Sequence, residues 1–205
     1  MTQQEFQTKL DRLAPDIAQI RYAAHSLHAS VNQTYDQVHP YGYHLDMVAS
    51  GVRTYGHQVC DNENDVLPLM FAAFYHDSIE DARQTYNDVV RTARQFMDEQ
   101  QALLAAEIVY ALTNDKGRSR SERAGERYYQ GIRETPYAPF VKLCDRLANT
   151  SYSFRNADEA NLHMRAVYAR EMPHFLQAIT VESDDPRYLL PTEMVEKILG
   201  LCAEG

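Results

Sequence analysis

The stretch VLPLMFAAFYHDSIED, residues 66–81, runs from a wholly apolar segment into a histidine and three carboxylates. Its apolar start has the length and composition of a buried helix. On a continuous helix, His76, Asp77, Glu80 and Asp81 would occupy an arc of roughly 140° that extends the core-facing side. Burying ionised carboxylates costs several kcal/mol each unless counter-charges, hydrogen bonds, protonation or a cation compensate. A divalent metal ion meets this demand, and a solvated helix start with a surface His–Asp pair is the plain alternative.

The rest of the chain shows the same helical pattern. Apolar residues recur at spacings of three and four, period-two runs are nearly absent, and clusters of Pro, Gly, Asn and Asp separate the segments. The predicted helical segments are 6–27, 43–52, 66–75, 89–96, 103–112, 140–152, 162–179 and 194–201. No repeat and no Gly/Ser-rich linker divides them. We predict an all-α fold in a single domain covering 1–205.

Composition limits the classes of function. A chain of 205 residues with 44% hydrophobic content suits one domain with a sizeable core. The net charge of −9 argues against nucleic acid as a partner. Cys60, Cys144 and Cys202 are widely separated and odd in number, which favours neither a disulfide framework nor a cysteine zinc site. We expect a cytoplasmic protein without a membrane partner, because no signal peptide and no run of ~20 apolar residues is present.

Two further polar residues lie in apolar helical faces. In HPYGYHLDMVASGV, residues 39–52, His44 shares a face with apolar neighbours, although a lone histidine there is usually a satisfied core residue. In PFVKLCDRLANTSYS, residues 139–153, Asp145 interrupts an apolar stripe, which is a costly position for an acid. Asn149 follows one turn later on the same face and can orient a ligand or contact a substrate.

These residues together form a plausible ligand set. His44, His76, Asp77 and Asp145 combine imidazole and carboxylate groups without a thiolate. Such a set suits a hard or borderline divalent ion, namely Mn²⁺, Fe²⁺ or Zn²⁺.

The order H…HD…D resembles the HD superfamily of metal-dependent phosphohydrolases. AAFYHDSIEDA, residues 72–82, is similar to the HD-x-x-ED segment in the hydrolase domains of RelA/SpoT enzymes and of stand-alone small alarmone hydrolases. Further segments match in the same order: PYGYH (40–44), ALTNDKG (111–117) and VKLCDRLANT (141–150). The resemblance spans about residues 20–180 and implies a helical HD-domain bundle with a metal site in its core.

The resemblance also implies roles for the polar residues. His44, His76, Asp77 and Asp145 would hold one metal ion, with Mn²⁺ preferred and Fe²⁺ or Zn²⁺ as alternatives. The acidic pair that positions and deprotonates the attacking water corresponds to Glu80 and Asp81. The alternative is a purely structural role for these two residues, as negative charges or caps at a helix start.

Contacts to substrate are expected from a basic segment and three other positions. NDKGRSRSERAGER, residues 114–127, concentrates cations in an acidic chain, and a solvated charged face is its plain alternative. The resemblance places Lys116, and less directly Arg123, near the polyphosphate. It places Asn149 near the nucleotide. Tyr41 or His39 is expected to stack on the base of the substrate.

One segment departs from the family pattern. NQTYDQVHPYGYH, residues 32–44, lacks the basic residue and glycine that usually precede the PY…H motif, and an acid, Asp36, is present instead. Metal binding is expected to survive this change, whereas the recognition of guanosine 3′-diphosphate is left open.

We therefore predict a stand-alone metal-dependent phosphohydrolase, since 205 residues leave no room for a synthetase domain after the hydrolase. The expected substrate is a small nucleotide of the (p)ppGpp type, from which the 3′-pyrophosphate is removed, as by a guanosine-3′,5′-bis(diphosphate) 3′-pyrophosphohydrolase. The alternatives are an HD phosphohydrolase acting on another nucleotide or phosphoester, and a non-catalytic HD module that senses a nucleotide. The oligomeric state is left open.

Overall fold

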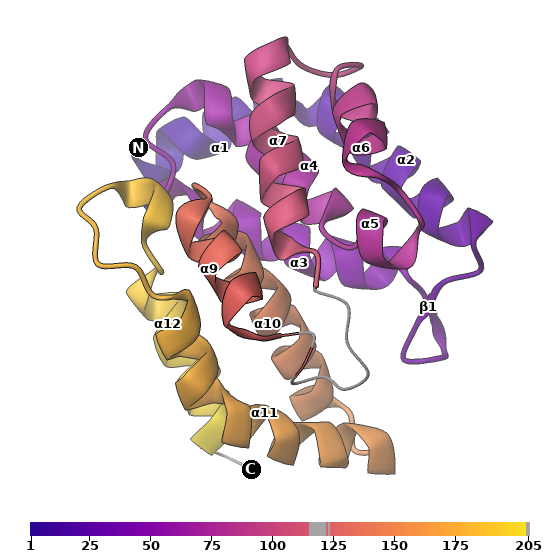
Figure 1. Ribbon diagram of the computed structural model, residues 1–205, viewed down its shortest axis with the longest axis vertical. Coiled ribbons are helices and arrows are strands. Elements are labelled where there is room, and N and C mark those ends of the chain that lie inside the picture. Colours follow the sequence, from indigo (N-terminus) through magenta and orange to yellow (C-terminus); the bar gives the residue numbers. More distant parts are fainter. Residues whose placement is uncertain (115–121, 123, 204–205) are drawn as a thin grey trace.

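The computed structural model describes residues 1–114, 122 and 124–203 (Figure 1). Its helices and strands are α1 (Gln3–Arg12), α2 (Ala14–Ser30), β1 (Thr34–Tyr35), β2 (His39–Pro40), α3 (Gly42–Tyr55), η1 (Gly56–Gln58), η2 (Glu63–Asp65), α4 (Val66–Tyr75), α5 (Ser78–Asp81), α6 (Tyr86–Ala93), α7 (Glu99–Leu112), α9 (Glu126–Glu134), α10 (Ala138–Arg155), α11 (Glu159–Ile179), η3 (Pro186–Tyr188) and α12 (Thr192–Ala203). The predicted all-α class is confirmed.

Helix α4 forms the centre of the core. Every residue of α4 is buried, and the helix packs against α2, α3 and α7. Helix α10 runs along α3 and carries α9, α11 and α12 on its other sides (Figure 1). The apolar run 66–75 is therefore buried on all sides. The polar residues that follow it begin near the centre of the molecule.

The predicted helical segment 66–75 coincides with α4, but the chain does not continue as one helix through residues 76–81. Helix α4 ends at Tyr75, and His76 has the helical φ of −53° and ψ of −34° of a cap residue. Asp77 turns the chain with φ −99° and ψ 4°, and the short helix α5 follows it. Aspartate is a favoured residue at a helix start, but it also occurs inside helices, and the apolar periodicity alone carries no signal for this break. The break re-aims Glu80 and Asp81 relative to the ligand candidates.

Two other boundaries differ from the predicted segments. The segment 6–27 divides at Leu13 into α1 and α2, and Pro15 lies in the first turn of α2, where a missing N–H is tolerated. Helix α9 lies outside the predicted helical segments, because Tyr128, Tyr129 and Ile132 are its only buried residues among charged neighbours. Its three buried side chains nevertheless share one face of the helix at spacings of one, three and four.

A two-stranded hairpin precedes α3. Strands β1 and β2 are antiparallel, and Thr34 pairs with Pro40 while Tyr35 pairs with His39. It is the only sheet in the described part of the chain, and it lies beside α3 (Figure 1). The hairpin occupies the segment that departs from the family pattern.

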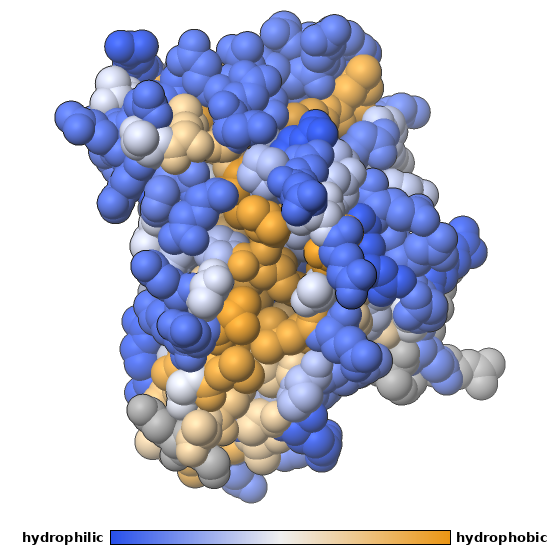
Figure 2. All heavy atoms as spheres, turned by 90° about the vertical axis from the view of Figure 1, so that its left-hand side faces the viewer, coloured by the Kyte–Doolittle hydropathy of each residue, from blue (hydrophilic) through white to orange (hydrophobic). Residues whose placement is uncertain are grey.

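The surface opposite the hairpin is partly apolar. Figure 2 shows a band of hydrophobic residues down the face that lies to the left in Figure 1, bordered by polar residues. Two exposed leucines near the C-terminus, Leu189 and Leu199, are 41% and 44% exposed. None of the described helices combines the length and the hydropathy that crossing a membrane requires.

Candidate metal centre

Three separate segments bring the four predicted ligands together. His44 lies in the first turn of α3, His76 and Asp77 lie at the break between α4 and α5, and Asp145 lies in the middle of α10. His44 and His76 are each 2% exposed, and Asp145 is 9% exposed. The pairs α3–α4 and α3–α10 pack closely, so these side chains meet in the core rather than on a surface.

The nitrogen and oxygen atoms of these residues converge. The Nε2 atoms of His44 and His76 are 3.2 Å apart. Asp145 Oδ1 lies 3.3 Å from His44 Nε2, and Asp77 Oδ2 lies 2.8 Å from His76 Nε2. His44, His76 and Asp145 each offer one ligand atom, and these atoms lie within 4.8 Å of one another. This buried group can hold a metal ion, and Asp77 Oδ2, 3.6 Å from His44 Nε2, lies beside it.

Three comparisons with known proteins bear on this arrangement. No model of a protein family matches the chain, and no curated protein matches its sequence. A solved structure does match, described as a metazoan ortholog of SpoT that hydrolyses ppGpp and plays a role in starvation responses. The two chains are 18% identical, the match covers 90% of this chain and 94% of the other, and the TM-score is 0.59.

The chain shares the fold of that ppGpp hydrolase. The resemblance inferred from the sequence is confirmed at the level of the fold, with the His/Asp cluster in the core of a helical domain. An identity of 18% shows the fold alone, so the chemistry has to be argued from the residues themselves.

Hydrogen bonds from surrounding groups fix two of the four ligand candidates, His76 and Asp145. His76 Nδ1 is 3.0 Å from the carbonyl oxygen of Ala73, which presents Nε2 to the cluster. Asp145 accepts hydrogen bonds from Lys142 Nζ at 2.8 Å and from Asn149 Nδ2 at 2.5 Å. A ligand histidine that donates its second N–H to a carbonyl, and a ligand carboxylate that accepts further bonds, are what metal sites ordinarily show.

Tyr41 fixes a third ligand candidate, Asp77. Its hydroxyl donates to Asp77 Oδ2 at 2.5 Å, and its ring stacks on that of His28, with centroids 4.6 Å apart. Tyr41 was predicted to stack on a substrate base, and in the structure the ring of His28 stacks on its ring. Asn149 was predicted to contact the nucleotide, and it lies on the cavity wall with its amide bonded to Asp145.

The charges of the cluster are strongly coupled. Burial alone would raise the pKa of Asp145, but Lys142 and the two histidines hold that pKa well below its usual range. Burial would lower the pKa of His76, but Asp77 beside it raises this pKa to about 9. The carboxylates are thus ionised and the cluster attracts positive charge, supplied by a proton when no metal is bound. Metal binding would release that proton, as is usual when a cation replaces it on histidine.

The predicted acid/base pair lies at the rim of the cluster. Glu80 is exposed, and its carboxylate accepts hydrogen bonds from Asn114 Nδ2 at 2.8 and 3.0 Å. Asp81 is half-buried, and burial together with the charge of Asp77 raises its pKa to about 6, although a hydrogen bond from Tyr41 opposes the shift. A carboxyl group with a pKa near 6 can take up and release a proton close to neutrality.

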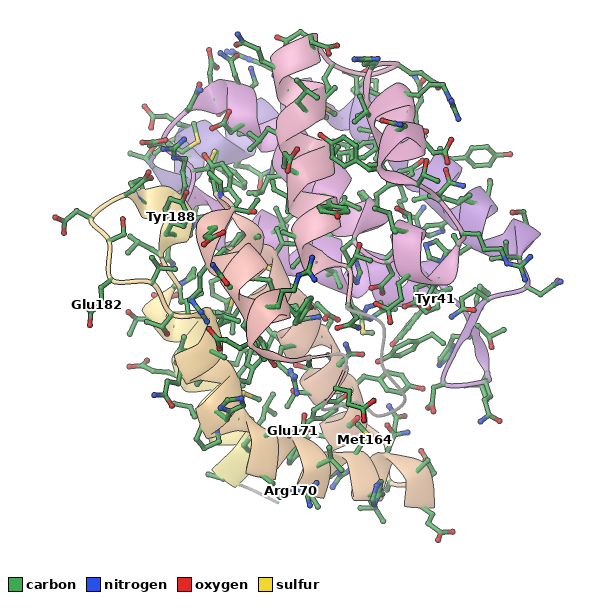
Figure 3. All side chains as sticks on the ribbon, viewed as in Figure 1. Tyr41, Met164, Arg170, Glu171, Glu182 and Tyr188 are labelled. Atoms are coloured by element: carbon green, nitrogen blue, oxygen red, sulfur yellow. The ribbon has the colours of Figure 1, made fainter. Side chains whose placement is uncertain are left out.

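A large cavity opens from the cluster toward α11. Its volume is about 1030 Å³, and it is lined at one end by Tyr41, His44 and Asp145 and at the other by Tyr168 and Arg170. In Figure 3 Tyr41 lies beside the hairpin, whereas Arg170 and the adjacent glutamate lie on α11. The predicted polyphosphate residues Lys116 and Arg123 lie outside the described residues.

The sequence reasoning missed several residues of this cavity. Lys142 precedes Asp145 by three residues, and this helical spacing was the available signal for its ion pair. Arg146 is 8% exposed and lies between aromatic rings, with its guanidinium 4.3 Å from the centroid of Phe175. Tyr35 and Tyr168 also line the cavity. No spacing links them to the ligands, because α11 and the hairpin reach the site only through the tertiary fold.

Proposed function

We propose that this protein is a metal-dependent phosphohydrolase that removes the 3′-pyrophosphate of (p)ppGpp-like nucleotides and leaves GDP or GTP. One observation carries the proposal: two histidines and two aspartates converge at the inner end of a cavity of about 1030 Å³, with two further carboxylates at its rim. The solved structure with the same fold, which hydrolyses ppGpp, supports the choice of substrate.

His44, His76, Asp77 and Asp145 are the residues that would hold the metal, and Mn²⁺ is the ion we propose first. The chemistry of the donors fits such an ion, because they are imidazoles and carboxylates with no thiolate. When bound, a divalent ion lowers the pKa of water and neutralises charge that develops on a phosphoryl oxygen. Two hydrogen bonds already present would orient the ligands: His76 Nδ1 donates to the carbonyl oxygen of Ala73, and Asn149 Nδ2 donates to Asp145.

Glu80 and Asp81 are proposed to handle the protons. Asp81, with its raised pKa, would accept a proton from the attacking water and return it to the leaving oxygen. Glu80, oriented by Asn114, would position that water by accepting a hydrogen bond from it. The side chain of Tyr41 would keep Asp77 in place by its hydroxyl.

The cavity suits a nucleotide in size. Pockets for small ligands have volumes of about 300–1,000 Å³, and a single phosphate group would leave most of this cavity empty. Lys116, Arg123, Asn149 and Tyr41 remain our proposed contacts to the substrate.

A second candidate is phosphohydrolysis of another nucleotide or phosphoester. The observation that favours it is the hairpin, which carries no lysine or arginine between residues 34 and 40. Tyr35 and Asp36 are bonded to other protein side chains instead. A non-catalytic module that senses a nucleotide is the third candidate, and the same experiment tests it.

The deciding experiment measures release of pyrophosphate and phosphate by metal-free protein resupplied with Mn²⁺. The substrates are ppGpp, pppGpp and a panel of ordinary nucleotides and phosphoesters, and Asp145→Ala is the control. Pyrophosphate from ppGpp and pppGpp alone, lost in Asp145→Ala, is the expected result. Release of phosphate or pyrophosphate from a different ester would make that ester the substrate in place of (p)ppGpp. A protein that binds Mn²⁺ but turns over no ester would favour the sensing module.

A further inference from the structure

The two ligand histidines are held in different ways. His76 has the usual hydrogen bond from its second ring nitrogen, to the carbonyl oxygen of Ala73. His44 Nδ1 is buried and has no hydrogen-bond partner within the described residues. A ligand histidine without this bond is free to rotate about its Cβ–Cγ bond unless some other contact fixes the plane of its ring.

Tyr35 supplies such a contact. Its ring stacks face to face on that of His44, with centroids 5.0 Å apart and an interplanar angle of 11°. The edge of Tyr41 also faces His44, at 5.6 Å and 63°. Aromatic pairs at these separations attract one another beyond the area they bury. The plane of His44 is therefore set by rings rather than by a hydrogen bond.

Tyr35 reaches a second ligand through its hydroxyl. The hydroxyl donates to Asn149 Oδ1 at 2.9 Å. Asn149 Nδ2 in turn donates to Asp145 Oδ1 at 2.5 Å, and this is the oxygen that lies 3.3 Å from His44 Nε2. One side chain thus contacts one ligand with its ring and orients another through the amide of Asn149.

The hairpin holds Tyr35 firmly in this position. Asp36 and Gln37 at its tip have φ values of 51° and 59°, which are unfavourable for residues other than glycine. The Asp36 carboxylate offsets this cost by accepting hydrogen bonds from the Tyr152 hydroxyl at 2.8 Å and from Asn161 Nδ2 at 3.0 Å. The hairpin is thereby attached to α10 and α11, and it also contacts α3.

We infer that Tyr35 is a positioning residue of the metal centre, which fixes the ring plane of His44 by stacking and orients Asp145 through Asn149. The inference rests on the proposed function only in taking this cluster as a metal site. It gives the hairpin a function although the hairpin carries no lysine or arginine. The hairpin positions the metal ligands and does not bind a phosphate.

The test is metal binding, measured apart from turnover. Metal-free wild-type protein, Tyr35→Leu and Tyr35→Phe are titrated with Mn²⁺ by calorimetry, and the visible spectrum of each Co²⁺-loaded protein is recorded. We expect Tyr35→Leu to bind Mn²⁺ about 10- to 100-fold more weakly, the usual effect of removing a group that orients a ligand, and to show an altered Co²⁺ spectrum. Tyr35→Phe keeps the ring and loses the bond to Asn149, so its affinity should lie between the two.

Tyr110→Leu is the matched control, because Tyr110 is 59% exposed and its ring contacts Tyr86, at 5.7 Å, rather than a ligand or Tyr35. It should bind Mn²⁺ like the wild type. Unchanged affinity and spectrum in Tyr35→Leu would overturn the inference and leave the proposed function standing, whereas a wild-type protein that binds no metal would overturn both. If circular dichroism shows Tyr35→Leu to be unfolded, Tyr35→Phe decides, and wild-type affinity in that variant would overturn the inference.

Discussion

Asp145 is both a proposed metal ligand and the partner of a buried lysine. Lys142 Nζ lies 2.8 Å from its Oδ2, and the two side chains are 15% and 12% exposed. Asp145→Asn removes the negative charge and leaves Lys142 buried without it. We expect the metal-free variant to lose about 3–5 kcal/mol of unfolding free energy in urea, the usual cost of breaking a buried pair.

The control for this variant is Asp46→Asn, which breaks an exposed pair. Arg21 and Asp46 are 2.6 Å apart with side chains 52% and 35% exposed. Exposed pairs contribute about 0–1 kcal/mol, so this change should be nearly neutral. Equal losses in the two variants would contradict a special role for the Lys142–Asp145 pair.

Glu80 is expected to act in catalysis and not in metal binding. It lies at the rim of the cluster, and the metal candidates are the four residues inside it. Glu80→Gln should therefore keep the Mn²⁺ affinity of the wild type and lower kcat by roughly 10²- to 10⁴-fold, the range for loss of a residue that takes part in acid–base catalysis. Glu134→Gln, an exposed carboxylate on α9, serves as control. A Glu80→Gln variant that turns over at the wild-type rate would remove this residue from the mechanism.

His28 predicts a pH dependence of stability. Its ring is buried against Tyr41, neither ring nitrogen has a hydrogen bond within the described residues, and burial lowers its pKa from 6.5 to about 4. Between these two values the unfolded chain binds a proton that the native protein does not. The free energy of unfolding should therefore fall by about 3 kcal/mol as the pH drops from 7 to 4, through this residue alone.

The variant His28→Leu isolates this contribution from that of the acids. Relative to the wild type, the metal-free variant should gain stability steadily as the pH falls from 7 to 4, as measured by urea denaturation at each pH. His163→Gln changes an exposed histidine of α11 and should follow the wild-type curve. A difference between His28→Leu and wild type that is the same at every pH would contradict the prediction.

At the scale of elements, the helices could be predicted from the sequence and the junctions could not. Segments such as 66–75 and 103–112 carry a burial pattern that only a helix satisfies, and α4 and α7 lie there. The break at His76 and Asp77 has no such signal. It is set by tertiary contacts, since Ala73, Tyr41 and the other ligands hold both side chains where a continuous helix would not place them.

The hairpin shows the same limit. Two strands of two residues have no readable period, and the left-handed residues Asp36 and Gln37 are not glycines. The sequence marked this segment only as a departure from a family pattern. Its role became visible when Tyr35 was found on His44 and Asp36 on α10 and α11.

The attachment of the hairpin predicts the effect of changing Asp36. Asp36→Ala loses two accepted hydrogen bonds and the side chain that tolerates a left-handed backbone, so we expect a loss of about 2 kcal/mol in unfolding free energy. Asp36→Asn keeps one acceptor oxygen and the local preference, and should lose less. Urea denaturation of the metal-free proteins measures both. Identical stabilities for Asp36→Ala and the wild type would show that the hairpin is not held through this carboxylate.

At the scale of the whole molecule, the proposed metal ligands could be predicted from the sequence, because a polar residue in an apolar helical face stands out from its neighbours. An acid in an apolar stripe, as at Asp145, demands a partner wherever the helix lies. The cavity and its far wall gave no such signal, because Arg146, Tyr168 and Arg170 look like ordinary helix residues until α10 and α11 are packed together.

The proposed metal site is built from all these parts, so metal binding should stabilise the entire fold. The ligands come from α3, from the α4–α5 break and from α10, and the unfolded chain cannot present them together. At Mn²⁺ concentrations 100-fold above Kd, we expect a gain of about 2.7 kcal/mol and a rise in Tm of roughly 5–10 °C for a chain of this size. Calorimetric scans with and without Mn²⁺ measure the shift. Asp145→Asn should show none of it, because the shift depends on an intact ligand set, and Mg²⁺ in place of Mn²⁺ should shift Tm less, because imidazole suits Mg²⁺ poorly. A Tm that stays constant over this range in the wild type would mean that the four residues hold no ion, and that their buried charge is balanced by Lys142 and a proton alone.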